Sequence, residues 1–511
     1  MADYTPQEAF EKCLGIIRND AQIIERLDNY LMGHHDPVYI PDNADAEFSM
    51  IAKRAPLNMI PLVVNSVTQV CYVEGIRHAS TEAKNDAEAD DGELDAEMKS
   101  WQRNRMDAKQ MPITRALATH GITYVLTTKS PKNSKHAIYS AFTAAQAAAL
   151  FDDPVNDHDP TWGLVIKSGS VSSVKVAWLF NEESWWRVTP GNNGMNFQLQ
   201  GKHGMSACPL SRGVLHMDLH GNVVGLVEPC IQPQNAINQT SFDVLTTQSY
   251  GSFKVRTATG MAIPVKRWSR AEIDFAYPAP PEGADPELIE RYENRPAVGD
   301  PILDANGQEQ PLPVSISQKR FLTAEDPDTK FGTLPETNVE PILKALGDRV
   351  KYLAAVSQTP PTYFMGELAN LSAEALQAAE VAKTRRDGEV KMALAEMYER
   401  ALSLGMEIEG HVKAAGDEGL EVKWADTDPR SLAAVADALG KMAEMLDVPP
   451  IALWEEIPDM TPGKLLRWKE LKKEWDAMHP EVEMIQKITD MGGVEASFPA
   501  YGDDEEVPLA A

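Results

Sequence analysis

The sequence is poor in cysteine, has fewer basic than acidic residues, and lacks long apolar runs. Its four cysteines, Cys13, Cys71, Cys208 and Cys230, are widely separated and form no CxxC pair. This spacing is typical neither of a disulfide framework nor of a zinc site, and it indicates a reducing compartment. No stretch approaches the ~18 consecutive apolar residues of a membrane span, and the N-terminus lacks a signal-peptide pattern. We therefore expect no membrane contact.

The charge balance argues against tight nucleic-acid binding. The chain carries 48 Lys and Arg against 76 Asp and Glu, a formal net charge of −28. Such a field repels phosphates unless a basic patch is segregated from it. The GxxxxGK[ST], strand-linked GxGxxG, HExxH and GxSxG motifs are all missing from the sequence. We therefore expect no catalytic residue, no cofactor and no metal site.

Two segments contain residue types that can bind metals, but their spacing does not fit a metal site. His34, His35 and Asp36 are consecutive, so their side chains diverge, and we interpret them as the turn that ends a helix. The segment Phe151 to Pro160 (FDDPVNDHDP) is acidic but lacks the glycine and terminal glutamate of a calcium loop. We expect a turn there too.

The N-terminal half predicts helices followed by an antiparallel meander. Thr5, Pro6 and Glu8 form a capping box that starts a helix, and Gly33 should end it. The apolar run Pro61 to Gly75 fits a helix or a helix that turns into a strand, and we favour a helix with its exit at Gly75. Strand-like runs follow, first WGLVIKS, VKVAWLF, SWWRV and NFQLQ, then a pair around HMDLHGNVVGLVEP. We expect Trp178, Trp185 and Trp186 to pack on a sheet face.

The C-terminal half predicts long helices around a proline-rich insert. A polar helix should occupy Pro233 to Phe253, and Lys254 to Pro335 is too rich in proline for long helices apart from a short one at Pro286 to Tyr292. Thr337 and Glu340 should cap the next helix. A long helix should start at Ser372, with Gly388 as a point of kinking. Its apolar seam is Val390, Leu394, Met397, Ala401, Leu404 and Ile408.

The order of these segments resembles the portal proteins of tailed bacteriophages of the siphophage type, the rings through which DNA is packaged. AINQTSFDVLTTQSYGSFKVRTATG (Ala236 to Gly260) is similar to the family's first stem helix and following strand. TPPTYFMGELANLSAEALQAAE (Thr359 to Glu380) looks like its tunnel loop and the start of its long helix, with Ala373 where glycine is common. The helix ending in YLMGHH and the PLVVNSVTQVCYVEG run complete the resemblance.

The resemblance implies an α+β portal fold with a mixed α/β wing, a two-helix stem, an irregular clip, a long kinked helix and an α-helical crown. The implied boundaries are wing 1–233, first stem helix 234–253, clip 254–337, second stem helix 338–357, tunnel loop 358–371, long helix and return to the wing 372–425, crown 426–480 and acidic tail 481–511. It also implies a homo-oligomeric ring of twelve subunits at one capsid vertex, assembled in the bacterial cytoplasm. The implied partners are the major capsid and scaffolding proteins, the terminase motor, head-to-tail connector proteins and double-stranded DNA that passes through without sequence-specific binding.

The resemblance assigns roles to two groups of residues. The implied DNA-facing tunnel loop contains Pro360, Pro361, Tyr363, Phe364, Met365, Gly366 and Asn370. The implied stem residues are Asn238, Gln239, Thr240, Leu343, Leu346 and Val350. The alternative for the loop is an ordinary helix-loop-helix whose aromatic side chains sit in the core. The alternatives for the protein are a minor head or scaffold-associated protein, or a packaging-associated ATPase or nuclease.

Overall fold

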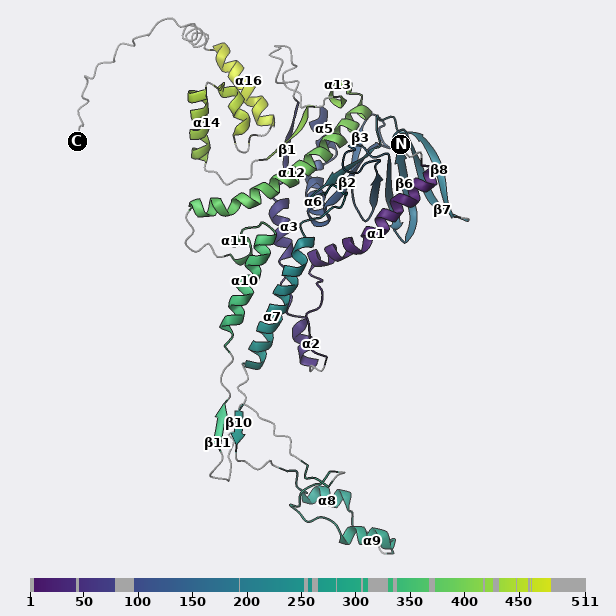
Figure 1. The fold of residues 1–511 in the computed structure, drawn as a ribbon, viewed down its shortest axis with the longest axis vertical. Coiled ribbons are helices and arrows are strands. Elements are labelled where there is room, and N and C mark those ends of the chain that lie inside the picture. The colour runs from purple at the N-terminus through teal and green to yellow at the C-terminus, as the bar shows by residue number, and fades with distance from the viewer. Residues whose placement is uncertain are drawn as a thin grey trace, which may run out of the picture. The chain divides into compact units, whose positions relative to one another are not determined.

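A computed structural model describes most of the chain (Figure 1). The described residues are 4–42, 46–78, 96–192, 194–251, 256–259, 265–281, 283–304, 307–310, 330–333, 338–366, 373–416, 419–425, 432–446, 448–457, 460 and 462–478. The chain forms two compact units, one made of Met1–Phe242 and Lys344–Ala511 and the other of Asp243–Leu343. The mixture of helices and strands confirms the predicted α+β class.

The first helix, α1 (Pro6–Met32), begins and ends where its sequence predicts. The backbone N–H of Glu8 donates to Thr5 Oγ1 at 3.4 Å, and that of Thr5 donates to Glu8 Oε2 at 2.9 Å. These two bonds are the predicted capping box. Gly33 ends the helix at φ 88, in the left-handed region that glycine adopts without strain. The histidines that follow therefore form the expected helix-terminal turn.

The apolar run Pro61 to Gly75 is a helix followed by a strand, so our preference for a helix ending at Gly75 was wrong. Helix α3 (Ile60–Thr68) ends early, and β1 (Val73–His78) contains Gly75. The reason is distant in sequence, because β1 pairs antiparallel with β12 (Leu420–Trp424). Three further helices lie nearby in sequence: α2 (Ala46–Ala52), α5 (Ala96–Arg103) and α6 (Met106–His120).

Two antiparallel sheets form the β-rich part of the first unit. One has the order β3-β2-β9 and the other β4-β5-β6-β7-β8. Their strands are β2 (Ile122–Lys129), β3 (Ala137–Thr143), β4 (Ala147–Leu150), β5 (Trp162–Ser170), β6 (Ser173–Asn181), β7 (Ser184–Gly191), β8 (Gly194–Lys202) and β9 (Leu210–Val214). Strands β5 to β8 are the predicted meander. The predicted strand pair after β9 is wrong, because only a single bridge, Met217 to Val223, forms there.

The aromatic residues of the meander pack on its faces as predicted. Trp186 lies 5.3 Å from Trp162 between ring centroids, and Trp185 lies 5.7 Å from Trp178. Buried residues of α1, including Phe10, share one core cluster with residues of β4 to β7. Helix α1 therefore covers one face of the five-stranded sheet.

The largest core forms around α12 (Ala373–Glu409), which runs without interruption through Gly388. Helix α12 contacts β2, β3, β9 and β12. Its predicted apolar seam is confirmed: Val390, Leu394, Met397, Ala401 and Leu404 are buried, and Ile408 is partly buried. The kink predicted at Gly388 stays a prediction.

The remaining helices of the described chain lie between the elements above in sequence or follow them. Helices α7 (Ile231–Gly251, preceded by η1, Glu228–Cys230) and α10 (Glu340–Val356) correspond to the two predicted stem helices. Helix α11 (Thr362–Met365) separates α10 from α12. The C-terminal helices are α13 (Val412–Ala415), α14 (Leu432–Leu446), α15 (Pro450–Leu453), η2 (Trp454–Glu456) and α16 (Pro462–Met478).

The second unit holds short elements, as its prolines predict. It contains the antiparallel ribbon β10 (Arg256–Thr259) and β11 (Lys330–Thr333) and the helices α8 (Arg270–Ala276) and α9 (Pro286–Glu293). Helix α9 is the short helix predicted from sequence. Within the described parts of the whole chain, none of the helices is long and apolar enough to cross a membrane.

Candidate functional site

The candidate site is the segment between α10 and α12, which begins with a tight reversal. Helix α10 ends in a Schellman arrangement, in which the Thr359 N–H donates to Ala354 O at 3.0 Å and the Gln358 N–H donates to Ala355 O at 3.3 Å. Gln358 occupies the left-handed position at φ 51, where glycine is usual. This cap satisfies two carbonyls of the last turn. The carbonyl of Ser357 accepts from the Thr359 hydroxyl at 3.3 Å and can accept a second hydrogen bond.

The residues after the reversal divide into buried anchors and exposed groups. Pro360 is buried and Pro361 is exposed. Phe364 and Met365, on the short helix α11, pack against the main core. Tyr363 is 42% exposed, and Gly366 ends α11 at φ 64. Asn370 and the predicted helix start at Ser372 lie outside the described residues.

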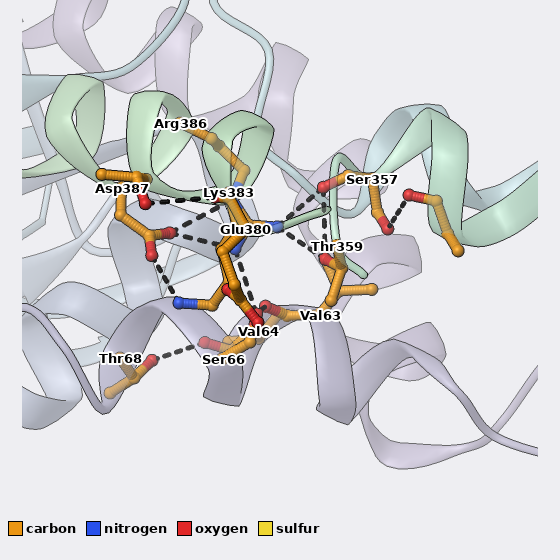
Figure 2. A network of polar contacts seen from close by, with 12 residues as sticks. Val63, Val64, Ser66, Thr68, Ser357, Thr359, Glu380, Lys383, Arg386 and Asp387 are labelled. Carbon is orange, nitrogen blue, oxygen red and sulfur yellow. Dashed lines mark hydrogen bonds and ion pairs between the residues drawn. The ribbon is translucent and has the colours of Figure 1, made fainter. Parts of the chain in front are cut away.

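Arg386 of α12 holds the reversal in place (Figure 2). Its side chain is almost completely buried, at 2% exposure. Nη1 donates to Ser357 O and to Thr359 Oγ1, both at 2.7 Å, and Nη2 donates to Ser66 Oγ of α3 at 3.1 Å. A single guanidinium group thus joins α3, the end of α10 and α12. Its planar fork of donors suits this geometry, which an ammonium group cannot reproduce.

Arg386 lies beside one acidic and one further basic side chain of α12. Asp387 accepts from Arg386 Nη2 at 3.0 Å and from Lys383 Nζ at 2.7 Å, and all three side chains are buried. The trio carries one surplus positive charge. Because Ser357 O belongs to the C-terminal end of α10, the negative end of that helix dipole lies against the guanidinium group. Arg386 therefore acts as a side-chain cap for α10.

Lys383 connects the same group to α11. Its ammonium nitrogen lies 5.7 Å from the ring centroid of Tyr363, within the range of a cation–π contact. Partial burial raises the pKa of the Tyr363 hydroxyl, and the charge of Lys383 opposes that rise. The α12 stretch from Lys383 to Asp387 therefore touches the reversal and α11 alike.

The polar side chains of the predicted stem residues on α7 form hydrogen bonds within the chain. Asn238 is 1% exposed; its Oδ1 accepts from Leu57 N at 3.2 Å and from Gln234 Nε2 at 2.9 Å, and its Nδ2 lies 2.9 Å from His35 Nδ1. Gln239 Oε1 accepts from Tyr39 N at 2.8 Å. These bonds attach the segment between α1 and α3 to α7.

The other predicted stem residues differ in their surroundings. Thr240 donates to Ala236 O at 2.8 Å within α7. On α10, Val350 is buried, Leu346 is partly buried against the main core, and Leu343 is 48% exposed. The three apolar stem residues of α10 are therefore part core and part surface.

The sequence analysis missed Lys383, Arg386 and Asp387. A signal for them exists, because Arg386 and Lys383 precede Val390 by four and seven residues and so extend the apolar seam of α12. Charged residues on a buried helical face are expected to be paired. Among the described residues, no group of His, Cys, Asp and Glu could hold a metal ion.

Comparison with known proteins gives one extended match. The family model described as phage portal protein, SPP1 Gp6-like, matches residues 11–478. No curated protein matches the chain.

Proposed function

The chain belongs to the SPP1 Gp6-like phage portal proteins, and on this premise we propose that it forms the ring that gates DNA passage at one capsid vertex. The family is structural rather than enzymatic, forms oligomeric rings and contacts capsid and packaging proteins. We propose a ring of twelve copies, assembled in the bacterial cytoplasm and contacting the scaffolding protein, the terminase motor and the head-to-tail connectors. The observation that carries this proposal is the family match, which spans 11–478.

The domain map predicted from sequence is part of the proposal. The β-rich sheets with α1 and α12 would form the wing, α7 and α10 the stem, and α14 to α16 the crown. The clip would be 254–337, which falls within the separate unit Asp243–Leu343. The division of the chain into units is compatible with this map.

In the proposed ring, only some side chains of the segment that follows α10 would face the channel. Phe364 and Met365 pack against the core, so in this arrangement they anchor α11. Pro361, Tyr363 and Gly366 are exposed, so we propose that these described residues approach DNA. A tyrosine and a glycine place no positive charge in the passage, which suits a channel that guides DNA without holding its phosphates.

The surface of α10 supports ring formation. Tyr352 is 60% exposed and Val356 is 48% exposed, four residues apart on one side of the helix. Large apolar groups gathered on one helix face are typical of surfaces that another protein covers. In a ring, a neighbouring copy would cover them.

Electron microscopy of the purified protein tests the proposal directly. We expect closed rings for the unmodified chain. Tyr352→Asp should reduce ring yield because it places a charge on the proposed contact, while Tyr352→Phe, the matched control, should assemble normally. A monomer at micromolar concentration in the unmodified protein would favour the minor head or scaffold-associated alternative. ATP hydrolysis or DNA cleavage that copurifies with the rings would favour an enzyme.

A further inference from the structure

The reversal between α10 and α11 is closed by hydrogen bonds of its own and is also bonded to α12. Its own backbone bonds close the Schellman cap, but they do not connect it to another element. The Ser357 carbonyl and the Thr359 hydroxyl, both buried, face Arg386. The path of the chain out of the stem is therefore held by a side chain of α12, in addition to the packing of Phe364 and Met365 against the core.

We propose that Arg386 is the positioning residue of the channel segment, by which we mean Ser357 to Gly366. It sets the direction in which the chain leaves α10, so that α11 and its exposed Tyr363 take their position from α12. The inference rests on the proposed function, since it concerns how the channel segment is held while DNA passes.

The hydrogen bonds of Arg386 make it a coupling group rather than a simple ion pair. Its carboxylate partner, Asp387, is its neighbour on α12, so the ion pair itself links no two elements. The bonds that cross between elements all go to neutral oxygens, on Ser66, Ser357 and Thr359. Asp387, which is also bonded to Lys383, orients the guanidinium group, and the Arg386 donors then reach α3 and the reversal together.

Lys383 extends the same coupling to α11. Its ammonium group is bound to Asp387 and lies over the Tyr363 ring. A displacement of α12 at Lys383 to Asp387 would therefore move the reversal and Tyr363 in the same direction. Conversely, force applied to Tyr363 would reach α12.

Arg386→Lys tests the coupling because it keeps the positive charge but cannot bond Ser66, Ser357 and Thr359 at once. Arg400→Lys is the matched control: Arg400 also lies on α12 and makes a two-pronged bond to Asp159, at 2.6 and 2.7 Å, away from the channel segment. Thr359→Val removes one acceptor and serves as a milder second variant. The readouts are ring yield, hydrogen exchange at the Thr359 amide, and the ratio of DNA-filled to empty heads.

For Arg386→Lys we expect a normal ring yield and a fall in the ratio of DNA-filled to empty heads. Hydrogen exchange at the Thr359 amide should be roughly tenfold to hundredfold faster, which is the effect expected for the loss of a hydrogen bond to a charged group. Thr359→Val should shift the filled-head ratio in the same direction by less, and Arg400→Lys should leave it unchanged. The proposal is overturned if Arg386→Lys fills heads as well as Arg400→Lys does, or if it abolishes rings, which would make Arg386 part of the scaffold. Failure of the unmodified protein to form rings would instead overturn the proposed function.

Discussion

Removing the side chain of Asn238 tests whether the polar half of α7 holds the chain together or faces DNA. A polar helix with few charges would suit a surface that DNA passes without being held. In the structure, Asn238 is enclosed between α7 and the segment that leads from α1 to α3, with bonds to Leu57, Gln234 and His35. Asn238→Ala would remove all of them at once.

The expected cost follows from the number of bonds. At about 1 kcal/mol net for each of three hydrogen bonds, Asn238→Ala should destabilise the attachment by about 3 kcal/mol, or more where the Leu57 N–H is left without an acceptor. About 3 kcal/mol corresponds to roughly a hundredfold increase in local opening. The matched control is Gln239→Ala, one residue away, which removes a single bond to Tyr39 and should cost about 1 kcal/mol.

Hydrogen exchange at the Met59 amide can report this opening. That N–H donates to Gln234 Oε1 at 3.0 Å, so it detects release of the segment although it does not contact Asn238. We expect much faster exchange in Asn238→Ala than in Gln239→Ala, with little change in the sheets. Equal exchange in the two variants would refute the structural role. A fall in filled heads without faster exchange would restore the DNA-facing interpretation.

Three further predictions concern backbone geometry and pH. Gln358→Gly should raise thermal stability by about 1 kcal/mol, because glycine adopts the left-handed φ of 51 without strain, whereas Gln358→Ala should bring no such gain. In Gly366→Pro, the proline can neither adopt φ 64 nor donate to Thr362 O, so the ratio of DNA-filled to empty heads should fall. Ring yield should stay unchanged because the affected turn is exposed, and a loss of rings would contradict this prediction. The pKa of Asp36 is lowered by hydrogen bonds, first from Tyr30 and then from Arg26 and Asn235. The contribution of Asp36 to folding stability is therefore present above the ordinary pKa of 3.8 and is lost as the pH falls through the lower pKa of the folded state. Asp36→Asn should remove this acid dependence of stability, measured by unfolding at a series of pH values.

Local patterns predicted the elements whose causes are local. Thr5, Glu8 and Gly33 define α1 through bonds within a few residues, and the short β-rich runs of the meander mark strands β5 to β8. Strand β1 could not be predicted in this way, because its partner strand lies at Leu420 to Trp424. In its local sequence, Gly75 instead suggests the end of a helix. Long-range pairing overrode the local signal.

The candidate site was predicted in outline only. The proline pair correctly marked the end of α10, but Tyr363, Phe364 and Met365, predicted as loop, lie on the short helix α11. The burial of Phe364 and Met365 depends on a core assembled from distant segments, which no local pattern encodes. Arg386 was missed because a charged residue in a helix is normally solvated, and only the phase of the seam distinguishes it. The amides of α7 look alike in sequence, yet Asn238 is enclosed and others are exposed.

The pairing of β1 with β12 has a consequence for synthesis on the ribosome. Val73–His78 leaves the ribosome long before its partner Leu420–Trp424, which follows roughly 340 residues later. At ~5–20 residues per second, β1 waits on the order of 20 to 70 seconds for its partner. Throughout that interval Val73 and Ile76, both buried in the finished core, lack the strand that completes their surroundings. A chain truncated before Leu420 would lack this partner strand, so only copies that extend past Trp424 could close the core.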